Sequence, residues 1–292
     1  MQASISKGDG VFLLQSEKTL FVSDSVIDTI YLENKIPIIY QSYFYPNMYL
    51  ELKGTSKSAL GKVDYNNSCI ELIKNRKSVY GMAPKNKEQV FALDALMNED
   101  ITVVVLTGAS GGGKSFCSLL AALQKMQTNK YEKIVLTKPM QEVGRYKLGS
   151  LPGDEKEKIM PYLINYQCNI ERILGSTIKL EDLINDMKLS IVPIQLLRGA
   201  SFYKSFILAD EVQILYPNEI LTIGTRIGEK SKLVLMGDLN QRDENISIKD
   251  TGLYKLINND KFLNSPLTAH INFQKCERSP TAALFANIFE GV

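Results

Sequence analysis

Histidine and cysteine are scarce in this chain of 292 residues. With one histidine, His270, we expect neither a catalytic triad nor a multi-histidine metal site, and we interpret His270 as structural. The four cysteines are dispersed and form no Cys-X-X-Cys pair. Dispersed cysteines are typical of reduced thiols in an intracellular protein, not of a disulfide framework. We therefore expect a cytoplasmic protein.

Long apolar runs and a strong net charge are also missing. No apolar run approaches the roughly 20 residues that cross a membrane, and the N-terminus lacks the apolar core of a signal peptide. The net charge of +2 creates no global field that demands an anionic partner. A hydrophobic content of 45% and a charged content of 23% are typical of a globular protein, and we expect no membrane partner.

The first 80 residues contain short apolar segments rich in β-branched and aromatic side chains. Residues typical of turns separate these segments. We expect strands at residues 11–14, 19–22, 27–32, 36–40 and 48–52, and one helix at about residues 66–74. The sequence thus predicts a small β-rich N-terminal domain over residues 1–80.

After residue 85, longer helical segments alternate with short apolar strands. We expect helices at residues 86–97, 116–126, 155–173 and 181–186. We expect strands at residues 101–106, 134–137, 191–194, 205–209 and 232–236. This alternation predicts a parallel sheet with helices on both faces. The predicted fold class is therefore α/β, with residues 81–292 forming the core around a mainly parallel sheet.

A glycine-rich segment lies between the strand expected at residues 101–106 and the helix that follows. Residues 108–115 read Gly-Ala-Ser-Gly-Gly-Gly-Lys-Ser and fit the Walker A pattern. Glycines let backbone N–H groups curl around phosphate oxygens, and the N-terminus of the helix adds positive charge. We expect Lys114 to reach the β- and γ-phosphates and the Ser115 hydroxyl to ligate Mg²⁺. The alternative is a glycine-rich turn that matches by chance.

Two carboxylates, Asp210 and Glu211, end the apolar strand at residues 205–209. The carboxyl ends of parallel strands form the edge where α/β sheets bind ligands. Asp210 is the candidate Mg²⁺ ligand, and Glu211 is the candidate general base for an attacking water. The alternative is a solvated acid pair that caps a helix.

An amide, Gln241, follows the next strand and is a candidate sensor of the γ-phosphate. The alternative is a plain turn between a strand and a helix. Together with the acid pair, this pattern predicts ATP and Mg²⁺ as ligands. The candidate nucleotide-binding residues of the loop are Gly108, Ala109, Ser110, Gly111, Gly112, Gly113, Lys114, Ser115 and Phe116.

Further short motifs occur along the second part of the chain. They span residues 85–94, 138–144, 148–158, 161–162, 197–199, 210–213, 221–228, 237–241 and 276–279. In these motifs the chain resembles the PhoH family of P-loop ATPases. Residues 1–80 resemble the connector that precedes the ATPase core in fusions of a PIN nuclease with PhoH. No spaced set of acids precedes residue 80, so we do not expect the ribonuclease activity of those fusions.

The chain departs from the family pattern at several positions. Gly112 and Ser115 stand where threonines are usual, and Ser115 still offers a hydroxyl. Lys138 stands where arginine is usual, which keeps the charge but loses the planar fork. Val212 and Ile214 also replace the usual residues. We expect ATPase activity to be retained.

The resemblance implies a RecA-like core without the second core domain of true helicases. It implies ring oligomers, hexamers among them, in which a neighbouring subunit supplies an arginine finger. Arg278 is the first candidate for that arginine and Arg226 the second, because both lie in family motifs. Resemblance to adenine-reading glutamines of helicases makes Gln89 the candidate reader of the base. The resemblance also implies coupling of hydrolysis to RNA or single-stranded DNA.

A basic segment at residues 53–87 is one candidate for nucleic-acid contact. It has eight Lys and Arg residues against two acidic ones, a local charge of +6. Aromatic residues at 40–45 could supply stacking faces, and residues 145–158 are a second candidate. The alternatives are a solvated lysine face and an aromatic core. A nucleotide-dependent protein switch or a phosphotransferase also remains open as a function, although Glu211 with Gln241 favours hydrolysis.

Overall fold

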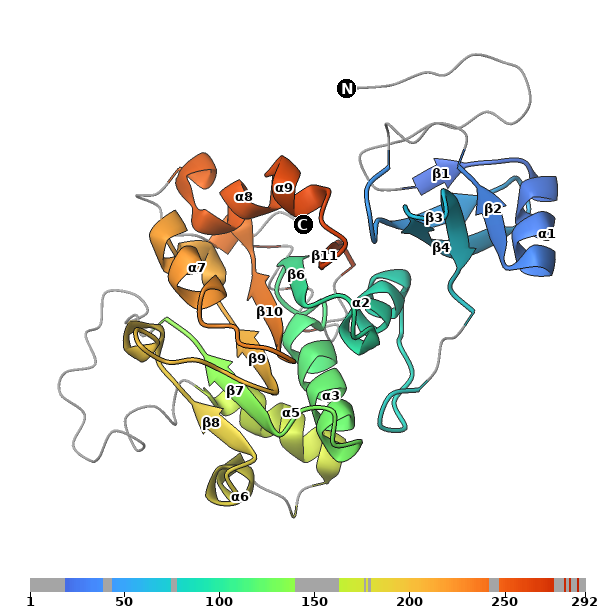
Figure 1. Cartoon of the computed structure of the whole chain (residues 1–292). Coiled ribbons are helices and arrows are strands. Elements are labelled where there is room, and N and C mark those ends of the chain that lie inside the picture. The colour runs from blue at the N-terminus through green and yellow to red at the C-terminus, as the bar shows by residue number, and fades with distance from the viewer. Residues whose placement is uncertain are drawn as a thin grey trace.

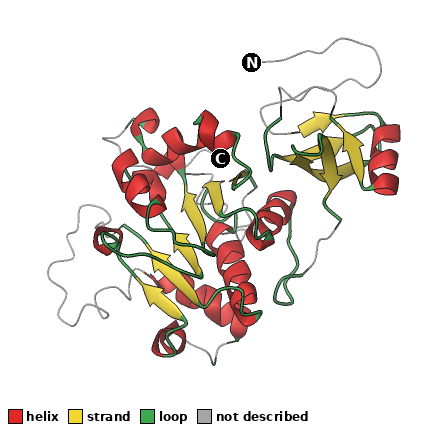
Figure 2. Ribbon diagram, in the orientation of Figure 1, coloured by secondary structure: helices red, strands yellow, loops and turns green. Residues whose placement is uncertain are grey.

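The computed structural model describes residues 19–38, 44–74, 78–139, 163–175, 177, 180–241, 247–275, 281, 284 and 288. Two β-sheets organise these residues (Figures 1 and 2). A five-stranded sheet occupies the N-terminal part, and a six-stranded sheet forms the centre of the remainder. Among the described residues, no helix is long and apolar enough to cross a membrane.

The N-terminal sheet has the strand order β1-β3-β4-β5-β2. β1 and β3 pair in parallel, and the other pairs are antiparallel. Helix α1 packs on this sheet and completes a small apolar core. The elements are β1 Thr19–Phe21, α1 Asp24–Glu33, β2 Lys35–Pro37, β3 Tyr49–Lys53, β4 Ser58–Asp64 and β5 Cys69–Leu72.

Helix α1 occupies the segment that the sequence predicts as a strand at residues 27–32, so that prediction is wrong. Ile27 and Ile30, three residues apart, are both buried in the N-terminal core. Asn34 ends the helix in a left-handed conformation, and its N–H donates to the Ile30 carbonyl at 2.9 Å. A short apolar run does not separate helix from strand by periodicity, so burial against the sheet decides.

The helix expected at residues 66–74 is also wrong, because strand β5 lies there. The Asp64 carboxylate accepts hydrogen bonds from the backbone N–H and the side-chain amide of Asn67, at 3.1 and 2.6 Å. This turn reverses the chain between β4, which the sequence did not predict, and β5. The strand expected at residues 11–14 lies outside the described residues.

The six-stranded sheet has the order β11-β6-β10-β9-β7-β8, and all its strands are parallel. The predicted α/β fold with a mainly parallel sheet is therefore confirmed. The edge strand β11 was not predicted, and the strand expected at residues 191–194 ends at Ile191. The strands are β6 Val103–Gly108, β7 Lys133–Thr137, β8 Leu189–Ile191, β9 Ser205–Ala209, β10 Lys232–Gly237 and β11 Thr268–Phe273.

Helices cover both faces of this sheet (Figure 1). One face carries α2 Lys87–Met97, α3 Lys114–Gln127, α5 Ile164–Leu174 and α6 Leu180–Asn185. The other face carries α7 Pro217–Gly224, α8 Gly252–Ile257 and α9 Asp260–Leu263. The helix predicted at residues 86–97 is confirmed as α2. The described part of the helix predicted at residues 155–173 is helical from Ile164.

Helix α2 lies between the two sheets and joins them (Figure 1). The Tyr49 ring of β3 packs on Phe91 of α2 with 5.4 Å between ring centroids. The Tyr49 hydroxyl donates to Asp94 at 2.7 Å. The side chain of Asn47 donates to the backbone carbonyl of Thr268 at the start of β11, at 3.0 Å. The N-terminal sheet therefore contacts α2 and β11, while the boundary expected at residue 80 stays a prediction.

Candidate nucleotide site

The loop between β6 and α3 is built on glycines in left-handed conformations. Gly108, Gly111 and Gly113 have φ angles of 112°, 82° and 102°. A Cβ on Gly108 would lie 2.0 Å from the carbonyl oxygen of Phe273, so a larger residue does not fit. Gly113 precedes the first residue of α3, so the loop leads directly into a helix N-terminus. This geometry is that of a phosphate-binding loop.

Lys114 folds its side chain over this loop. Its Nζ donates to the carbonyl oxygens of Gly108 and Ala109, at 2.5 and 3.0 Å. Phe116 is the third residue of α3, and the guanidinium of Arg172 lies 4.8 Å from the centroid of its ring. The loop thus holds an ammonium group at its centre, as phosphate binding requires.

Asp210 and Ser115 meet at the carboxyl edge of the sheet. The Ser115 hydroxyl donates to Asp210 Oδ2 at 3.3 Å, and the buried hydroxyl of Tyr166 donates to the same oxygen at 3.0 Å. Burial raises the pKa of the Asp210 carboxyl and Glu211 adds to this, while Lys138 and the Tyr166 hydrogen bond lower it. A serine hydroxyl beside a carboxylate offers the oxygen ligands that Mg²⁺ prefers, so this donor set fits the ion.

Tyr166 is a site residue that sequence reasoning missed. It comes from α5 and is 1% exposed. Burial, and then Asp210, raises the pKa of Tyr166 well above its ordinary value, so the hydroxyl remains a donor. A buried tyrosine in an amphipathic helix gives no signal of this role in the sequence, because core packing explains it equally well.

Glu211 adopts a left-handed conformation with a φ of 56°. Its Oε2 accepts from the side-chain amide of Gln213 at 2.8 Å, and its Oε1 lies 3.7 Å from Lys138 Nζ. Gln213 is buried, and its own oxygen accepts from the backbone N–H of Asp238 at 3.2 Å. Gln213 therefore fixes Glu211 and ties the end of β9 to the end of β10.

The other predicted site residues lie at different distances from this centre. Gln241 is exposed at the end of a 3-10 turn, and its backbone N–H donates to Asp238 at 2.9 Å. Arg226 follows α7, and its carbonyl accepts from the N–H of Phe202 ahead of β9, so it lies at the opposite, amino edge of the sheet. Arg278 and residues 145–158 lie outside the described residues.

Gln89 is buried against the loop. Its amide nitrogen donates to the carbonyl of Gly112 at 3.1 Å, and its amide oxygen accepts from the N–H of Lys85 at 2.9 Å. A Cβ on Gly113 would lie 2.9 Å from the same nitrogen. The structure therefore gives Gln89 a second interpretation besides adenine reading, since it braces the glycine loop.

A glycine loop between a strand and a helix of a parallel sheet, with a serine–carboxylate pair beside it, defines a P-loop NTPase. The chain belongs to the PhoH-like protein family, whose sequence profile matches residues 81–290. Membership of this family implies that the chain binds a nucleotide, usually with Mg²⁺.

Two relatives cover most of the chain. "Protein PhoH2" of Mycolicibacterium smegmatis is 32% identical over 272 residues, which are 93% of this chain and 61% of the relative. "Protein PhoH2" of Bacillus subtilis is 32% identical over 282 residues, which are 93% of this chain and 63% of the relative. The chain thus spans less than two thirds of the length of these relatives.

Solved structures of low similarity also match. A Sulfolobus solfataricus SWI2/SNF2 ATPase core in complex with dsDNA has a TM-score of 0.41 and 16% identity, covering 68% of this chain and 47% of its own. Pif1 helicase from Candida albicans has a TM-score of 0.34 and 15% identity, covering 72% of this chain and 44% of its own.

Proposed function

We propose that this chain hydrolyses ATP with Mg²⁺ and couples the cycle to RNA or single-stranded DNA as a ring of identical subunits. The observation that carries the proposal is the position of Glu211 directly beside the Ser115–Asp210 pair. A kinase excludes water from its site, whereas Glu211 is half-buried and accessible to water. Hydrolysis is therefore the reaction that this arrangement supports best.

The phosphates and the metal have separate groups of ligands in this proposal. Lys114 and the backbone N–H groups of the loop hold the phosphates, and Ser115 and Asp210 hold Mg²⁺. The bound ion supplies positive charge that neutralises the phosphate oxygens. Tyr166 keeps the Asp210 carboxylate oriented toward Ser115 through its hydrogen bond.

Glu211 takes the proton of the attacking water in this proposal. Gln213 holds one carboxylate oxygen, and Lys138 lies near the other, so the carboxylate has a fixed orientation. A residue other than glycine in a left-handed conformation stores strain of about 1–3 kcal/mol, and such strain concentrates at functional sites. Glu211 shares this backbone conformation with other residues such as Asn34, so its chemical role rests on its position beside Asp210 and on its fixed carboxylate.

Gln213 also provides a route from hydrolysis to movement. It bonds both Glu211 and the backbone of Asp238, and Asp238 begins the turn that carries Gln241. A change at Glu211 on loss of the γ-phosphate is therefore transmitted to the segment after β10. Gln241, exposed on that turn, is the proposed sensor.

The position of Arg226 supports the proposed ring. Because Arg226 lies at the amino edge of its own sheet, it reaches a nucleotide site only in a neighbouring copy. Its Nε is buried without a hydrogen-bond partner among the described residues, as expected of a side chain whose contacts are completed elsewhere. Arg278 remains the first candidate on the ground of its family motif.

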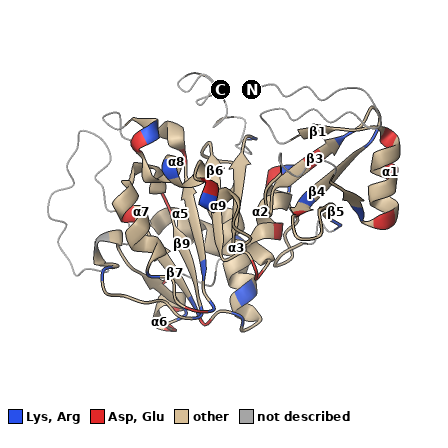
Figure 3. Ribbon diagram, turned by 45° about the horizontal axis from the view of Figure 1, so that its top comes forward, with Lys and Arg blue, Asp and Glu red and all other residues tan. Residues whose placement is uncertain are grey.

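The nucleic-acid part of the proposal rests on the family and on the basic segment at residues 53–87. Figure 3 shows Lys and Arg interspersed with Asp and Glu over both sheets. Lys57 and Lys62 of this segment form ion pairs with acids outside it, and so does Lys87, which lies 2.7 Å from Glu51. Among the described residues of the segment, Lys53, Lys74 and Lys85 are the proposed phosphate contacts.

Phosphate release tests the proposed function. We expect inorganic phosphate to appear from ATP with Mg²⁺, and poly(U) RNA or single-stranded DNA to raise its rate several-fold. Transfer of the phosphate to a protein or small-molecule acceptor would instead indicate a phosphotransferase. Hydrolysis that neither nucleic acid changes would leave an ATPase without the proposed coupling.

A further inference from the structure

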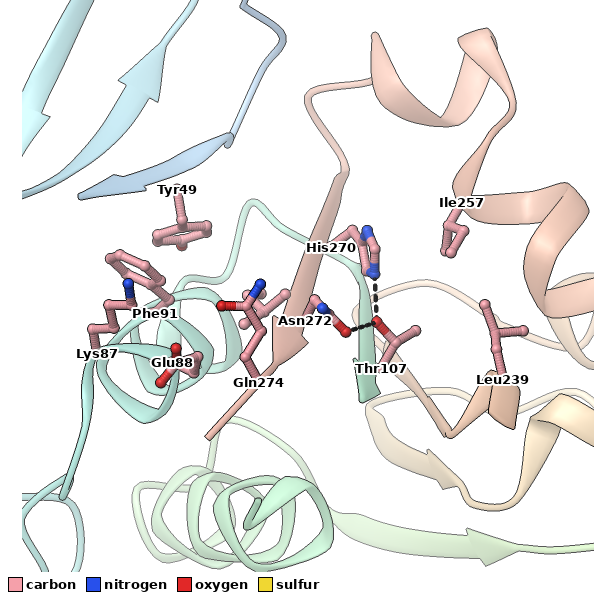
Figure 4. Close-up of a pocket in the computed structure, with 11 residues that line it drawn as sticks. Tyr49, Lys87, Glu88, Phe91, Thr107, Leu239, Ile257, His270, Asn272 and Gln274 are labelled. Atoms are coloured by element: carbon pink, nitrogen blue, oxygen red, sulfur yellow. Dashed lines mark hydrogen bonds between the residues drawn. The ribbon is translucent and has the colours of Figure 1, made fainter. Parts of the chain in front are cut away.

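A cavity of about 320 Å³ opens around the end of β11, beside the glycine loop (Figure 4). This volume is at the lower end of the roughly 300–1,000 Å³ range of small-molecule pockets. Side chains from β3, α2, β6, the turn after β10, α8 and the end of β11 line it. None of the roles assigned above to the nucleotide site uses this cavity.

The cavity reaches the start of the phosphate-binding loop through Thr107, which lines the cavity and directly precedes Gly108. Gln89 bonds to Gly112 of the loop, and its chain neighbour Glu88 lines the cavity. A molecule whose phosphates occupy the loop can therefore extend its remaining part into this space.

Glu88 gives the cavity an acceptor that lacks a partner. It is 6% exposed, and its Oε2 has no hydrogen-bond partner among the described residues. Its neighbour Lys87 is engaged by Glu51 at 2.7 Å. Glu88 lies in the first turn of α2, where the helix dipole favours a negative charge. A buried carboxylate oxygen without a donor is destabilising, so a ligand that brings an N–H group relieves this penalty.

The lining of the cavity combines aromatic and polar side chains. Figure 4 shows Tyr49 and Phe91 on one side of the strand β11, and His270 with Thr107 on the other. The Thr107 hydroxyl donates its hydrogen to Asn272 Oδ1 at 2.9 Å. His270 Nε2 lies 2.8 Å from the same hydroxyl oxygen and is therefore the donor in that contact. Aromatic surface combined with a few placed polar groups is the usual lining of a base-binding pocket.

We propose that this cavity receives the base of the bound nucleotide, and that Glu88 accepts a hydrogen bond from an exocyclic amino group of that base. The inference rests on the proposed nucleotide binding, and it adds the residue that determines which base the site prefers. A carboxylate only accepts hydrogen bonds, so it attracts an amino group and disfavours a carbonyl at the same position. Glu88 then selects the base, while its neighbour Gln89 supports the loop.

Equilibrium binding of four probes tests this inference. ATP carries a 6-amino group, GTP a 2-amino group, ITP neither, and inorganic tripolyphosphate has no base. We expect ITP to bind the wild-type chain about tenfold or more weakly than ATP, because a hydrogen bond to a charged group is lost. Glu88→Gln should bind ITP better than the wild type does, since an amide donates to the carbonyl. Glu88→Ala should bind ATP and ITP alike.

Tripolyphosphate and a matched variant separate specificity from stability. Both Glu88 variants should bind tripolyphosphate as the wild type does, and Glu229→Gln, which changes an exposed acid, should keep every preference. If the wild type binds GTP more tightly than ITP and both Glu88 variants lose this difference, the result would support Glu88 as the acceptor of a hydrogen bond from the 2-amino group of guanine. Equal binding of ATP, GTP and ITP by the wild type would overturn the inference. An unchanged ranking in both variants, or a parallel loss of tripolyphosphate binding, would also overturn it.

The inference and the proposed function fail differently. If the wild type binds ATP and Lys114→Ala does not, the nucleotide site stands whatever Glu88 does. If the wild type binds neither ATP nor tripolyphosphate, the proposed function fails and the inference fails with it.

Discussion

Lys232 and Asp210 are buried charged residues at opposite edges of the six-stranded sheet. Lys232 begins β10 at the amino edge, and its Nζ donates to the backbone carbonyls of Ala95 and Asn98 at the end of α2, at 3.0 and 2.5 Å. Asp210 follows β9 at the carboxyl edge, where the hydroxyls of Ser115 and Tyr166 contact it. The two edges therefore satisfy buried charge in different ways.

This difference distinguishes the amino edge, where Lys232 is bonded to the backbone at the end of α2, from the carboxyl edge, where the candidate nucleotide site lies. Backbone carbonyls at a helix end are fixed by the helix, so Lys232 gives up its contacts only if the fold opens. Hydroxyl groups on side chains rotate, so Ser115 can exchange Asp210 for another partner without a change in the backbone. Arg226 is the exception at the amino edge, because its buried Nε has no partner among the described residues.

The largest expected effect breaks this comparison, because one of the two candidate catalytic arginines, Arg226, lies at the amino edge. We predict that Arg278→Ala or Arg226→Ala lowers ATP turnover by roughly 10³- to 10⁵-fold, by analogy with arginine fingers that act in trans. The measurement is phosphate release by each variant and by its mixture with Glu211→Gln protein. Mixed rings should regain turnover, because an intact pocket then meets an intact arginine.

Two results would contradict a finger supplied in trans. One is a mixture that forms mixed rings and never exceeds the summed activity of its components. The other is a chain that stays monomeric at every concentration and still hydrolyses ATP briskly.

The second effect separates binding from chemistry at the carboxyl edge. Glu211→Gln keeps the size of the side chain and removes the base, so turnover should fall by about 10²- to 10⁴-fold while ATP binding persists. Lys114→Ala removes the phosphate cation, so binding and turnover should both fall. Binding of a non-hydrolysable analogue and phosphate release measure the two. Near-normal turnover of Glu211→Gln would assign the base to another residue.

The third effect concerns the stability of the amino edge. Burial lowers the pKa of Lys232 to about 7, whereas a lysine in the unfolded chain has a pKa of about 10.4. Between these values the unfolded chain binds the extra proton. The free energy of unfolding should therefore rise with pH in this window, by at most about 1.4 kcal/mol per pH unit from this group.

Urea denaturation at pH 7 and pH 9 measures this contribution. Lys232→Met should show a smaller rise than the wild type, and Lys249→Met, which changes an exposed lysine, should match the wild type. Equal slopes for the wild type and Lys232→Met would show that Lys232 keeps an ordinary pKa.

The smallest expected effect concerns Gln89 at the carboxyl edge, and it distinguishes bracing of the glycine loop from adenine reading. Gln89→Ala removes the bonds to Gly112 and Lys85, and we expect a roughly fivefold loss of affinity for ATP, GTP and tripolyphosphate alike. Gln124→Ala, which removes a similar bond near the other end of α3, should leave these affinities unchanged. A loss confined to ATP, with a flattened preference over GTP, would instead support adenine reading by Gln89.

The strongly patterned segments of the core were predictable. β6, β9 and β10 are continuous apolar runs of a kind that only a covered parallel strand buries. β11 was not predicted, although Ala269, Ile271 and Phe273 alternate with Thr268, His270 and Asn272, which is the period-two pattern of a half-buried strand. In the N-terminal sheet, α1 and β5 were assigned wrongly because their segments are too short for periodicity to decide.

The sequence alone predicts the loop residues from Gly108 to Ser115 and the acids Asp210 and Glu211 as candidate site residues. Such predictions depend on short local patterns, since left-handed turns favour glycine and phosphates attract an ammonium group. The tertiary structure alone decided that Tyr166 of α5 contacts Asp210, that Gln213 contacts the backbone of Asp238, and that Glu88 lines a cavity beside β11, because each pairing joins elements distant in sequence. Their side chains gain meaning only from what packing places beside them: the carboxylate of the proposed metal ligand Asp210, the turn after β10 and a cavity next to the loop.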